Sequence, residues 1–122
     1  MSESLTPNST IDHWIAGRAC VPRGGEYLDN VDPKTGERLG GLARGDAADV
    51  DAAVQAAQDA PTLAVEERAQ LLEATAALAE RNLDVLAAAE AADSGKLLSA
   101  TTAGDIPRSI ENLRFYARAV RL

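Results

Sequence analysis

The strongest constraint on the fold is a change of sequence pattern at Gly45. Before it, short apolar stretches alternate with turn residues, and after it apolar residues recur every three or four positions. The first pattern is typical of β-hairpins and the second of amphipathic helices. Because no strand is predicted between the helices, we expect no βαβ crossover and no dinucleotide-binding sheet within these residues.

Two short β-hairpins are predicted in the first part of the chain. Residues 13–21 place apolar runs on either side of Gly17, which supplies the positive φ of a tight turn. Residues 27–42 repeat this arrangement around Asp32-Pro33-Lys34-Thr35-Gly36, where proline fixes φ and glycine takes the left-handed conformation. The polar residues 1–10 before the hairpins are predicted to form a disordered tail.

Three or four amphipathic helices are predicted in the second part. Asp46 can cap the first helix, Asp49 lies beside the positive end of its dipole, and Pro61 ends it. The second helix begins near Val65, and its apolar residues fall on one stripe. The stripe consists of Leu71, Leu72, Thr75, Leu78 and Ala79.

The later helices have their own start and stop signals. Asn82 marks the junction to a third helix, and Gly95 stands at the position where helices commonly end. The final helix is predicted to begin near Gly104, with Asp105 as its cap and Pro107 in its first turn.

The composition limits the partners and the location of the protein. A net charge of -7 argues against nucleic acid, because phosphate binding depends on clustered Lys and Arg. The longest alanine-rich run, residues 83–92, is far shorter than the roughly 20 apolar residues of a membrane helix. We therefore expect no nucleic-acid or membrane partner. The absence of a signal-like start and the single cysteine predict a cytoplasmic protein.

The core is expected to be weak, because aromatic residues make up only 3% of the chain and alanine dominates instead. Alanine favours helices but adds little buried apolar area. A free-standing fold would therefore be marginal.

No set of residues in the chain predicts a catalytic site. Cys20 lies between apolar strand residues without a base, which favours a small core or edge residue over a nucleophile. His13, the only histidine, is interpreted as structural, because a metal site needs several ligands. Gly24-Gly25 and Gly40-Gly41 are placed in turns rather than at a phosphate site. Glu66-Glu67 are expected to complement a helix dipole rather than to act as an acid–base pair.

Four motifs follow one another along the chain. They are "VDPKTGE" at 31–37, "ADVDAAVQAA" at 48–57, "DSGK" at 93–96 and "DIPRSIENLRFYA" at 105–117. In amino-acid sequence, order and spacing these motifs resemble the N-terminal part of the NAD(P)-dependent aldehyde dehydrogenases. The last motif is most similar to the branch that oxidises 2-amino- and 2-hydroxymuconic semialdehydes. The resemblance implies an α/β enzyme, α+β within this segment, of which residues 11–122 are the incomplete N-terminal portion.

The resemblance also implies an activity for the complete enzyme, the oxidation of an aldehyde to a carboxylic acid with NAD or NADP. In that family the catalytic cysteine, the general-base glutamate, the oxyanion-hole asparagine and the cofactor-binding strands follow the segment matched here. We therefore expect this chain alone to bind no cofactor and to be inactive. Its expected partner is the rest of the dehydrogenase subunit or a homologous subunit, and the complete enzyme is expected to be a homo-oligomer.

One site is implied within this segment, for a monovalent cation held by Asn30, Val31 and Asp105. Their amide, carbonyl and carboxylate oxygens are ligands that hard cations prefer, and the alternative is that Asp105 simply caps its helix. One departure from the family pattern bears on stability. Ala64 stands where the family has a capping serine, although Thr62 could replace that cap.

Two other functions stay open on the sequence alone. A split enzyme could assemble in trans, driven by burial of the apolar faces around Leu71, Leu78 and Leu113. Alternatively, the chain could be a small helical binding module that docks on a full-length homologue and modulates it.

Overall fold

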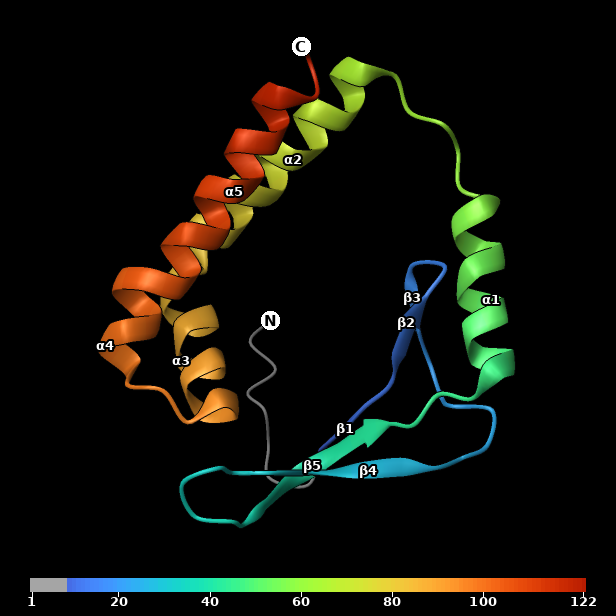
Figure 1. Cartoon of the computed structure of the whole chain (residues 1–122), viewed down its shortest axis with the longest axis vertical. Coiled ribbons are helices and arrows are strands. Elements are labelled where there is room, and N and C mark those ends of the chain that lie inside the picture. Colours follow the sequence, from blue (N-terminus) through green and yellow to red (C-terminus); the bar gives the residue numbers. More distant parts are fainter. Residues whose placement is uncertain (1–8) are drawn as a thin grey trace. The chain divides into compact units, whose positions relative to one another are not determined.

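A computed structural model describes residues 9–122 and divides the chain into two compact units, Met1–Pro61 and Thr62–Leu122 (Figure 1). The first unit contains the strands and one helix, and the second contains the remaining helices. Most of the predicted N-terminal tail lies outside the described residues. Its last two residues, Ser9 and Thr10, belong to a strand, so regular structure begins slightly earlier than expected.

The second predicted hairpin is confirmed and forms most of the sheet of the first unit. Strand β4 (Tyr27–Val31) pairs antiparallel with β5 (Arg38–Ala43). In the turn between them, the Gly36 amide donates to the Asp32 carbonyl at 2.7 Å, and Gly36 has a φ of +74°. Glycine adopts this left-handed conformation without a Cβ clash.

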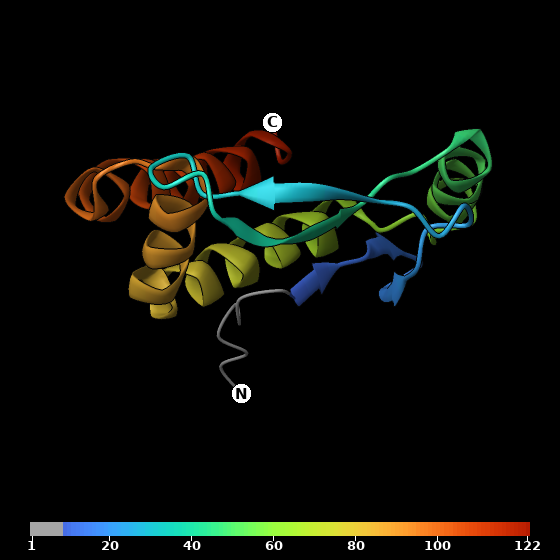
Figure 2. The same ribbon diagram turned by 90° about the horizontal axis from the view of Figure 1, so that it is seen from below.

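A third strand, β1 (Ser9–Ile11), pairs in parallel with β5, and the strand order is β1-β5-β4 (Figures 1 and 2). This pairing was not predicted. It joins residues that lie about thirty positions apart, Ser9 with Gly40 and Ile11 with Leu42. No local turn signal marks such a contact.

The prediction that Gly40-Gly41 lies in a turn is wrong, because both glycines are buried inside the central strand β5. A Cβ at Gly41 would lie 3.3 Å from the Tyr27 Cβ and 3.5 Å from the Thr10 Cγ2. Those two side chains belong to the strands on either side. Glycine at this point therefore allows both neighbouring strands to approach closely.

The first predicted hairpin is also confirmed. It consists of β2 (His13–Ile15) and β3 (Arg18–Cys20), which pair antiparallel. The two connecting residues both have positive φ, 53° at Ala16 and 75° at Gly17. This combination defines a type I′ turn, whose twist matches that of the flanking strands.

Helix α1 (Ala47–Gln58) begins as the sequence predicts. The Asp46 carboxylate accepts hydrogen bonds from the amides of Ala48 at 2.8 Å and Asp49 at 3.0 Å, and the Asp49 carboxylate accepts the Asp46 amide at 3.1 Å. These reciprocal bonds form a capping box. The apolar side chains of Val50 and Val54 on this helix are exposed within the chain.

The second unit begins with α2 (Val65–Arg81) and α3 (Leu83–Ser94). The junction at Asn82 has non-helical dihedral angles, and Gly95 ends α3 with a φ of +74°. Both were predicted. The N-cap of α2 is Ala64, which offers no side-chain acceptor.

Thr62 does not replace the missing cap of α2. Instead, the Glu67 carboxylate accepts a hydrogen bond from the Ala64 amide at 2.8 Å. Half of a capping box is therefore present. The backbone amides in the first turn of α2 that would donate to an N-cap serine hydroxyl make no hydrogen bond to a capping side chain.

The final helix begins earlier than predicted. Helix α4 (Leu98–Ala100), the π-helix η1 (Thr101–Asp105) and α5 (Ile106–Ala119) follow one another without a break. Asp105 therefore has helical dihedral angles and makes no capping hydrogen bond, so its predicted role as the cap is wrong. Pro107 cannot donate an amide, and its ring crowds the carbonyl four residues before it in an α-helix. A wider π-turn at this point accommodates the proline.

Counted as continuous rods, the described residues form four helices, in agreement with the prediction of three or four. Within the second unit, α5 packs along α2 (Figures 1 and 2). Alanines dominate their contact: Ala69, Ala76 and Ala117 are fully buried, and Ile110 is 3% exposed. Such small side chains let two helix backbones approach closely.

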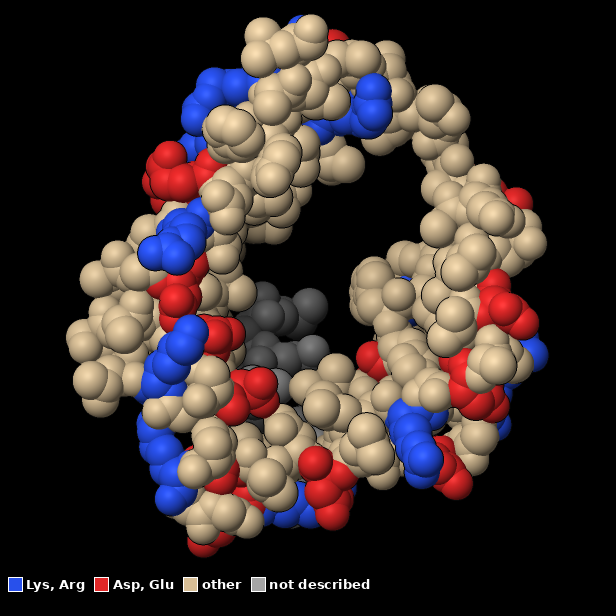
Figure 3. All heavy atoms as spheres, viewed as in Figure 1, with Lys and Arg blue, Asp and Glu red and all other residues tan. Residues whose placement is uncertain are grey.

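Two ion pairs tie the same helices together at the surface. Arg114 contacts Glu80 at 2.6 Å, and Arg121 contacts Glu66 at 2.9 Å. On the face of the molecule shown in Figure 3, acidic and basic side chains lie interleaved along these helices. These pairs are partly exposed, so each is expected to contribute at most about 1 kcal/mol to stability.

Candidate functional site

Two of the three implied cation ligands lie together in the first unit. Asn30 and Val31 are the last residues of β4, where the pairing with β5 shifts register. Asn30 is half-buried and lies opposite Gly40. An irregularity of this kind redirects the backbone locally, so the carbonyls at this point leave the regular ladder.

The third ligand, Asp105, lies in the second unit at the end of η1. Its carboxylate accepts a hydrogen bond from the Lys96 ammonium at 2.8 Å, and Glu90 lies 3.8 Å from the same ammonium. The hydrogen bond to Asp105 raises the pKa of Lys96 above its usual range. The oxygen donors suit a hard cation, but Lys96 already supplies a positive charge at this carboxylate. Sequence analysis did not predict this pair.

A buried carboxylate lies at the start of α1. Asp49 is 6% exposed and accepts the amides of Asp46 at 3.1 Å and Arg23 at 3.1 Å. These two amides, with the charges of His13 and Arg23, hold the pKa of Asp49 below its usual value, although burial opposes them. The position of Asp49 at the helix terminus was predicted. Its bond to the Arg23 amide was not, because a backbone amide carries no sequence signal.

His13 lies beside this carboxylate, with 3.7 Å between its Nε2 and the Asp49 Oδ2. The distance is too long for a hydrogen bond, and Nε2 is buried without one among the described residues. A Cβ at Gly45 would lie 3.2 Å from the Cε1 of the ring. Glycine therefore makes room for the imidazole, which packs at the start of α1.

Cys20 is half-buried on the first hairpin and lies opposite His13. Its thiol approaches two backbone carbonyls, those of Ile15 at 3.9 Å and Arg18 at 3.7 Å. A catalytic thiol instead requires a neighbouring base or a positive environment that favours the thiolate. This geometry agrees with a structural role for Cys20.

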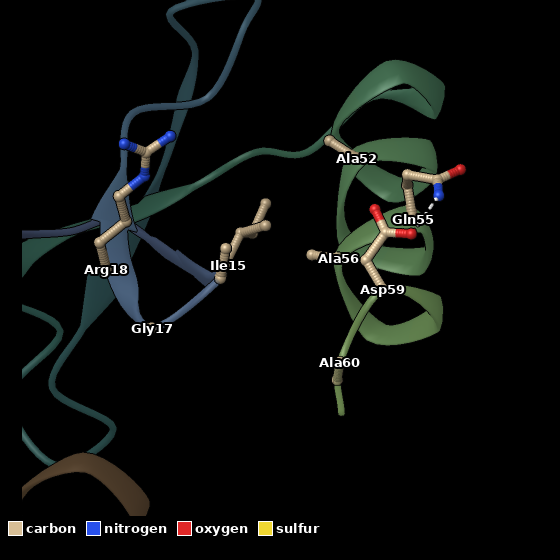
Figure 4. A pocket seen from close by; sticks show the side chains of 9 residues that line it. Ile15, Gly17, Arg18, Ala52, Gln55, Ala56, Asp59 and Ala60 are labelled. Atoms are coloured by element: carbon tan, nitrogen blue, oxygen red, sulfur yellow. Dashed lines mark hydrogen bonds between the residues drawn. The ribbon is translucent and has the colours of Figure 1, made fainter. Parts of the chain in front are cut away.

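An open groove of about 740 Å³ lies between the first hairpin and α1 (Figure 4). Ile15 points into it from the hairpin, and alanines line the helix side. Its polar side chains are few, and Gln55 donates to Asp59 at 3.0 Å within the helix. The groove is therefore lined mainly by apolar and small residues, and its polar lining residues are Arg18, Gln55 and Asp59.

The predicted helix-terminal acids have structural partners. Glu67 caps α2, and Glu66 binds Arg121 through both carboxylate oxygens. Hydrogen bonds from Arg121 and then from Gln70 lower the pKa of Glu66 to about 2. Both contacts are of a structural kind, as expected for acids in the first turn of a helix.

Over residues 9–122, no group of three or more His, Cys, Asp or Glu side chains is arranged to hold a metal ion. In the same part of the chain, none of the helices combines the length and the apolar character that a membrane crossing requires.

A family model for the aldehyde dehydrogenase family matches residues 20–122 without interruption. The chain belongs to the aldehyde dehydrogenase family. The aldehyde dehydrogenase of Paracoccus denitrificans is 37% identical over an alignment of 114 residues, and the match covers 90% of this chain and 22% of that protein.

Two solved structures resemble the fold of this chain. HpcC from Thermus thermophilus superimposes with a TM-score of 0.85 at 36% identity, covering 90% of this chain and 22% of that one. The NAD+ complex of the aldehyde dehydrogenase from Bacillus cereus gives 0.83 at 30% identity, covering 89% and 23%. The chain therefore spans between a fifth and a quarter of the length of these relatives.

Proposed function

We propose that this chain forms the N-terminal part of an NAD(P)-dependent aldehyde dehydrogenase subunit, an oxidoreductase that converts an aldehyde to a carboxylic acid. The family match over residues 20–122 carries the proposal. The limited coverage of the relatives supports a role as one part of a larger catalytic unit.

By itself the chain is proposed to be inactive. Aldehyde oxidation needs a thiolate to attack the carbonyl carbon, a donor for the oxyanion and a nicotinamide to accept hydride, all in one geometry. The chain has one cysteine, Cys20, and its thiol faces backbone carbonyls rather than a base.

The complete enzyme is proposed to use NAD or NADP, and this chain alone to bind neither. The NAD+ complex of the Bacillus cereus relative supports NAD. The dinucleotide phosphate site of a Rossmann fold uses a glycine-rich turn between a strand and a helix N-terminus. Gly40-Gly41 instead lies within strand β5, and Gly24-Gly25 precedes a strand rather than a helix.

The cation site stays a proposal, with Asn30, Val31 and Asp105 as its ligands. The oxygen atoms of these three residues support the proposal. The hydrogen bond from the Lys96 ammonium to the Asp105 carboxylate limits how a cation could bind there. A cation at this carboxylate must share it with the ammonium or displace it. Binding of K⁺ or Na⁺ should therefore tighten in a Lys96→Met variant, as measured by calorimetry on an assembled enzyme.

The test of the proposed function is a chimera in which this chain replaces the matching segment of the Paracoccus denitrificans relative. We expect the chimera to reduce NAD or NADP with an aldehyde, and the chain alone to give no NADH signal. The aldehyde panel should include 2-hydroxymuconic semialdehyde, to which the motif at 105–117 points. Activity of the purified chain alone, or a folded chimera without activity, would contradict the proposal.

A split enzyme that assembles in trans is a second candidate, favoured by the exposed apolar side chains of Leu71 and Leu78. In that case co-expression of this chain with the remainder of the relative should yield a co-purifying, active complex. The relative's own N-terminal segment, supplied in the same way, is the control.

A further inference from the structure

Helix α2 carries two apolar stripes on nearly opposite faces. One contains Ala69 and Ala76, which are fully buried and lie along the contact with α5. The other contains Leu71, Thr75 and Leu78, spaced four and three residues apart, so they form a single line on the helix. We call this line the α2 stripe. It is exposed within the chain, with Leu71 at 57% and Leu78 at 54%.

The polar groups on the α2 stripe are already satisfied within the helix. The Thr75 hydroxyl donates to the Leu71 carbonyl at 2.8 Å, and the side-chain amide of Asn82 donates to the Leu78 carbonyl at 2.8 Å. The threonine therefore presents its methyl group without an unpaired donor. Covering this stripe with an apolar surface would leave no buried polar group unsatisfied.

The α2 stripe also carries no charge. The two glutamates of α2 that bind arginines, Glu66 and Glu80, make those bonds to α5 and the residues that follow it. A basic or acidic partner would find no complementary group on the stripe itself. An apolar protein surface fits it best.

The length of the relatives indicates which polypeptide could cover the α2 stripe. In the solved aldehyde dehydrogenase from Bacillus cereus, more than three quarters of the chain lies outside the part that superimposes on this chain. A second copy of the chain fits less well, because stable dimers bury about 800 Å² per partner. Two half-exposed leucines and one threonine provide only part of that area.

We propose that the α2 stripe is a docking surface for the part of an aldehyde dehydrogenase subunit that this chain does not contain. The inference rests on the proposed function and adds which face of the chain receives that partner. The α5 side of α2 is already occupied within the chain. The stripe is the face left for an apolar element of the remaining polypeptide.

The test measures thiol reactivity at single cysteines, in the chain alone and in the chimera with the Paracoccus denitrificans relative. Both carry Cys20→Ser, and either Leu71→Cys or Leu78→Cys. The control is Gln70→Cys, an exposed position about 100° around the same helix from Leu71. Labelling by iodoacetamide is followed by mass spectrometry of the peptide that contains α2. The mass of this peptide distinguishes the engineered cysteine from the other cysteines of the chimera.

We expect Leu71→Cys and Leu78→Cys to react at least about 10-fold more slowly in the chimera than in the chain alone. Gln70→Cys should react at similar rates in both. Equal reactivity of Leu71→Cys and Gln70→Cys in the chimera overturns the proposal. So does concentration-dependent protection in the chain alone, with a dimer in sedimentation, because the occupant is then a second copy.

The two proposals fail in different ways in this experiment. Protected cysteines in an inactive chimera support the docking surface and contradict the proposed function. An active chimera with a reactive Leu71→Cys does the reverse. A chimera that does not accumulate, when the relative itself does under the same conditions, overturns the docking surface, because the remainder then does not accept this chain.

Discussion

The contact between α2 and α5 depends on small side chains, and Ala76→Leu tests this directly. Ala76 is fully buried there, among Ala69 and Ala117. An isobutyl group in place of the methyl must push the helices apart or force unfavourable rotamers. Overpacking of this kind costs about 1–3 kcal/mol. For the 61 residues of Thr62–Leu122, a typical stability is about 3–9 kcal/mol, so the loss is a large share.

The expected result is a fall in melting temperature of about 5–20 °C, followed by far-UV circular dichroism. The control is Ala74→Leu, the same change at an exposed position of the same helix, which should stay within about 0.5 kcal/mol of the wild type. Amide hydrogen exchange along α2 and α5 gives the same comparison without requiring a two-state melt. If Ala76→Leu destabilises no more than Ala74→Leu, close packing through alanine is not what holds these helices together.

Three further predictions follow from caps and carboxylates. Ala64→Ser should stabilise α2 by about 1 kcal/mol by supplying its missing N-cap acceptor, seen as a higher melting temperature; an unchanged or lower value would refute this. The lowered pKa of Asp49 means that its contribution to stability is fully present above the ordinary value of 3.8 and is lost as pH falls through the lowered one. Asp49→Asn should therefore flatten the acid dependence of amide protection in α1. Glu66, with a pKa of about 2 against an ordinary 4.5, should keep its bond to Arg121 until the pH falls toward 2. Carboxyl NMR measures this, and Arg121→Gln should return the Glu66 titration toward 4.5.

Turn and cap chemistry made much of the fold predictable. The positive φ of Gly17, the Asp32–Gly36 turn, the Asp46 cap and the Gly95 helix end all appear where the sequence indicates them. Each depends on groups within a few residues of one another. Local rules are therefore sufficient to place them.

The errors occur where residues distant in the chain meet or where the backbone leaves regular α-helical geometry. Gly40-Gly41 has the composition of a turn, but both residues lie buried in β5, and the neighbouring strands leave little room for a Cβ at Gly41. Asp105 and Pro107 have the composition of a helix start, yet a π-turn carries the helix through them. In both cases packing against a distant segment, or an unusual backbone turn, overrides the local preference.

The candidate site divides in the same way. Motifs at 31–37, 48–57, 93–96 and 105–117 were enough to indicate the family, because those residues recur in a fixed order. The partners of Asp49 and Asp105 could not be read from the sequence, since they are the Arg23 amide and a lysine brought close by folding.

The sequence by itself determined the family, the two hairpins and the helical second half. Only the tertiary structure decided which face of each helix is buried. On α2 the alanines, not the larger leucines, face α5, because close approach of two backbones requires small side chains. Leu71 and Leu78 therefore lie on the other side of α2, where each is more than half exposed among the described residues.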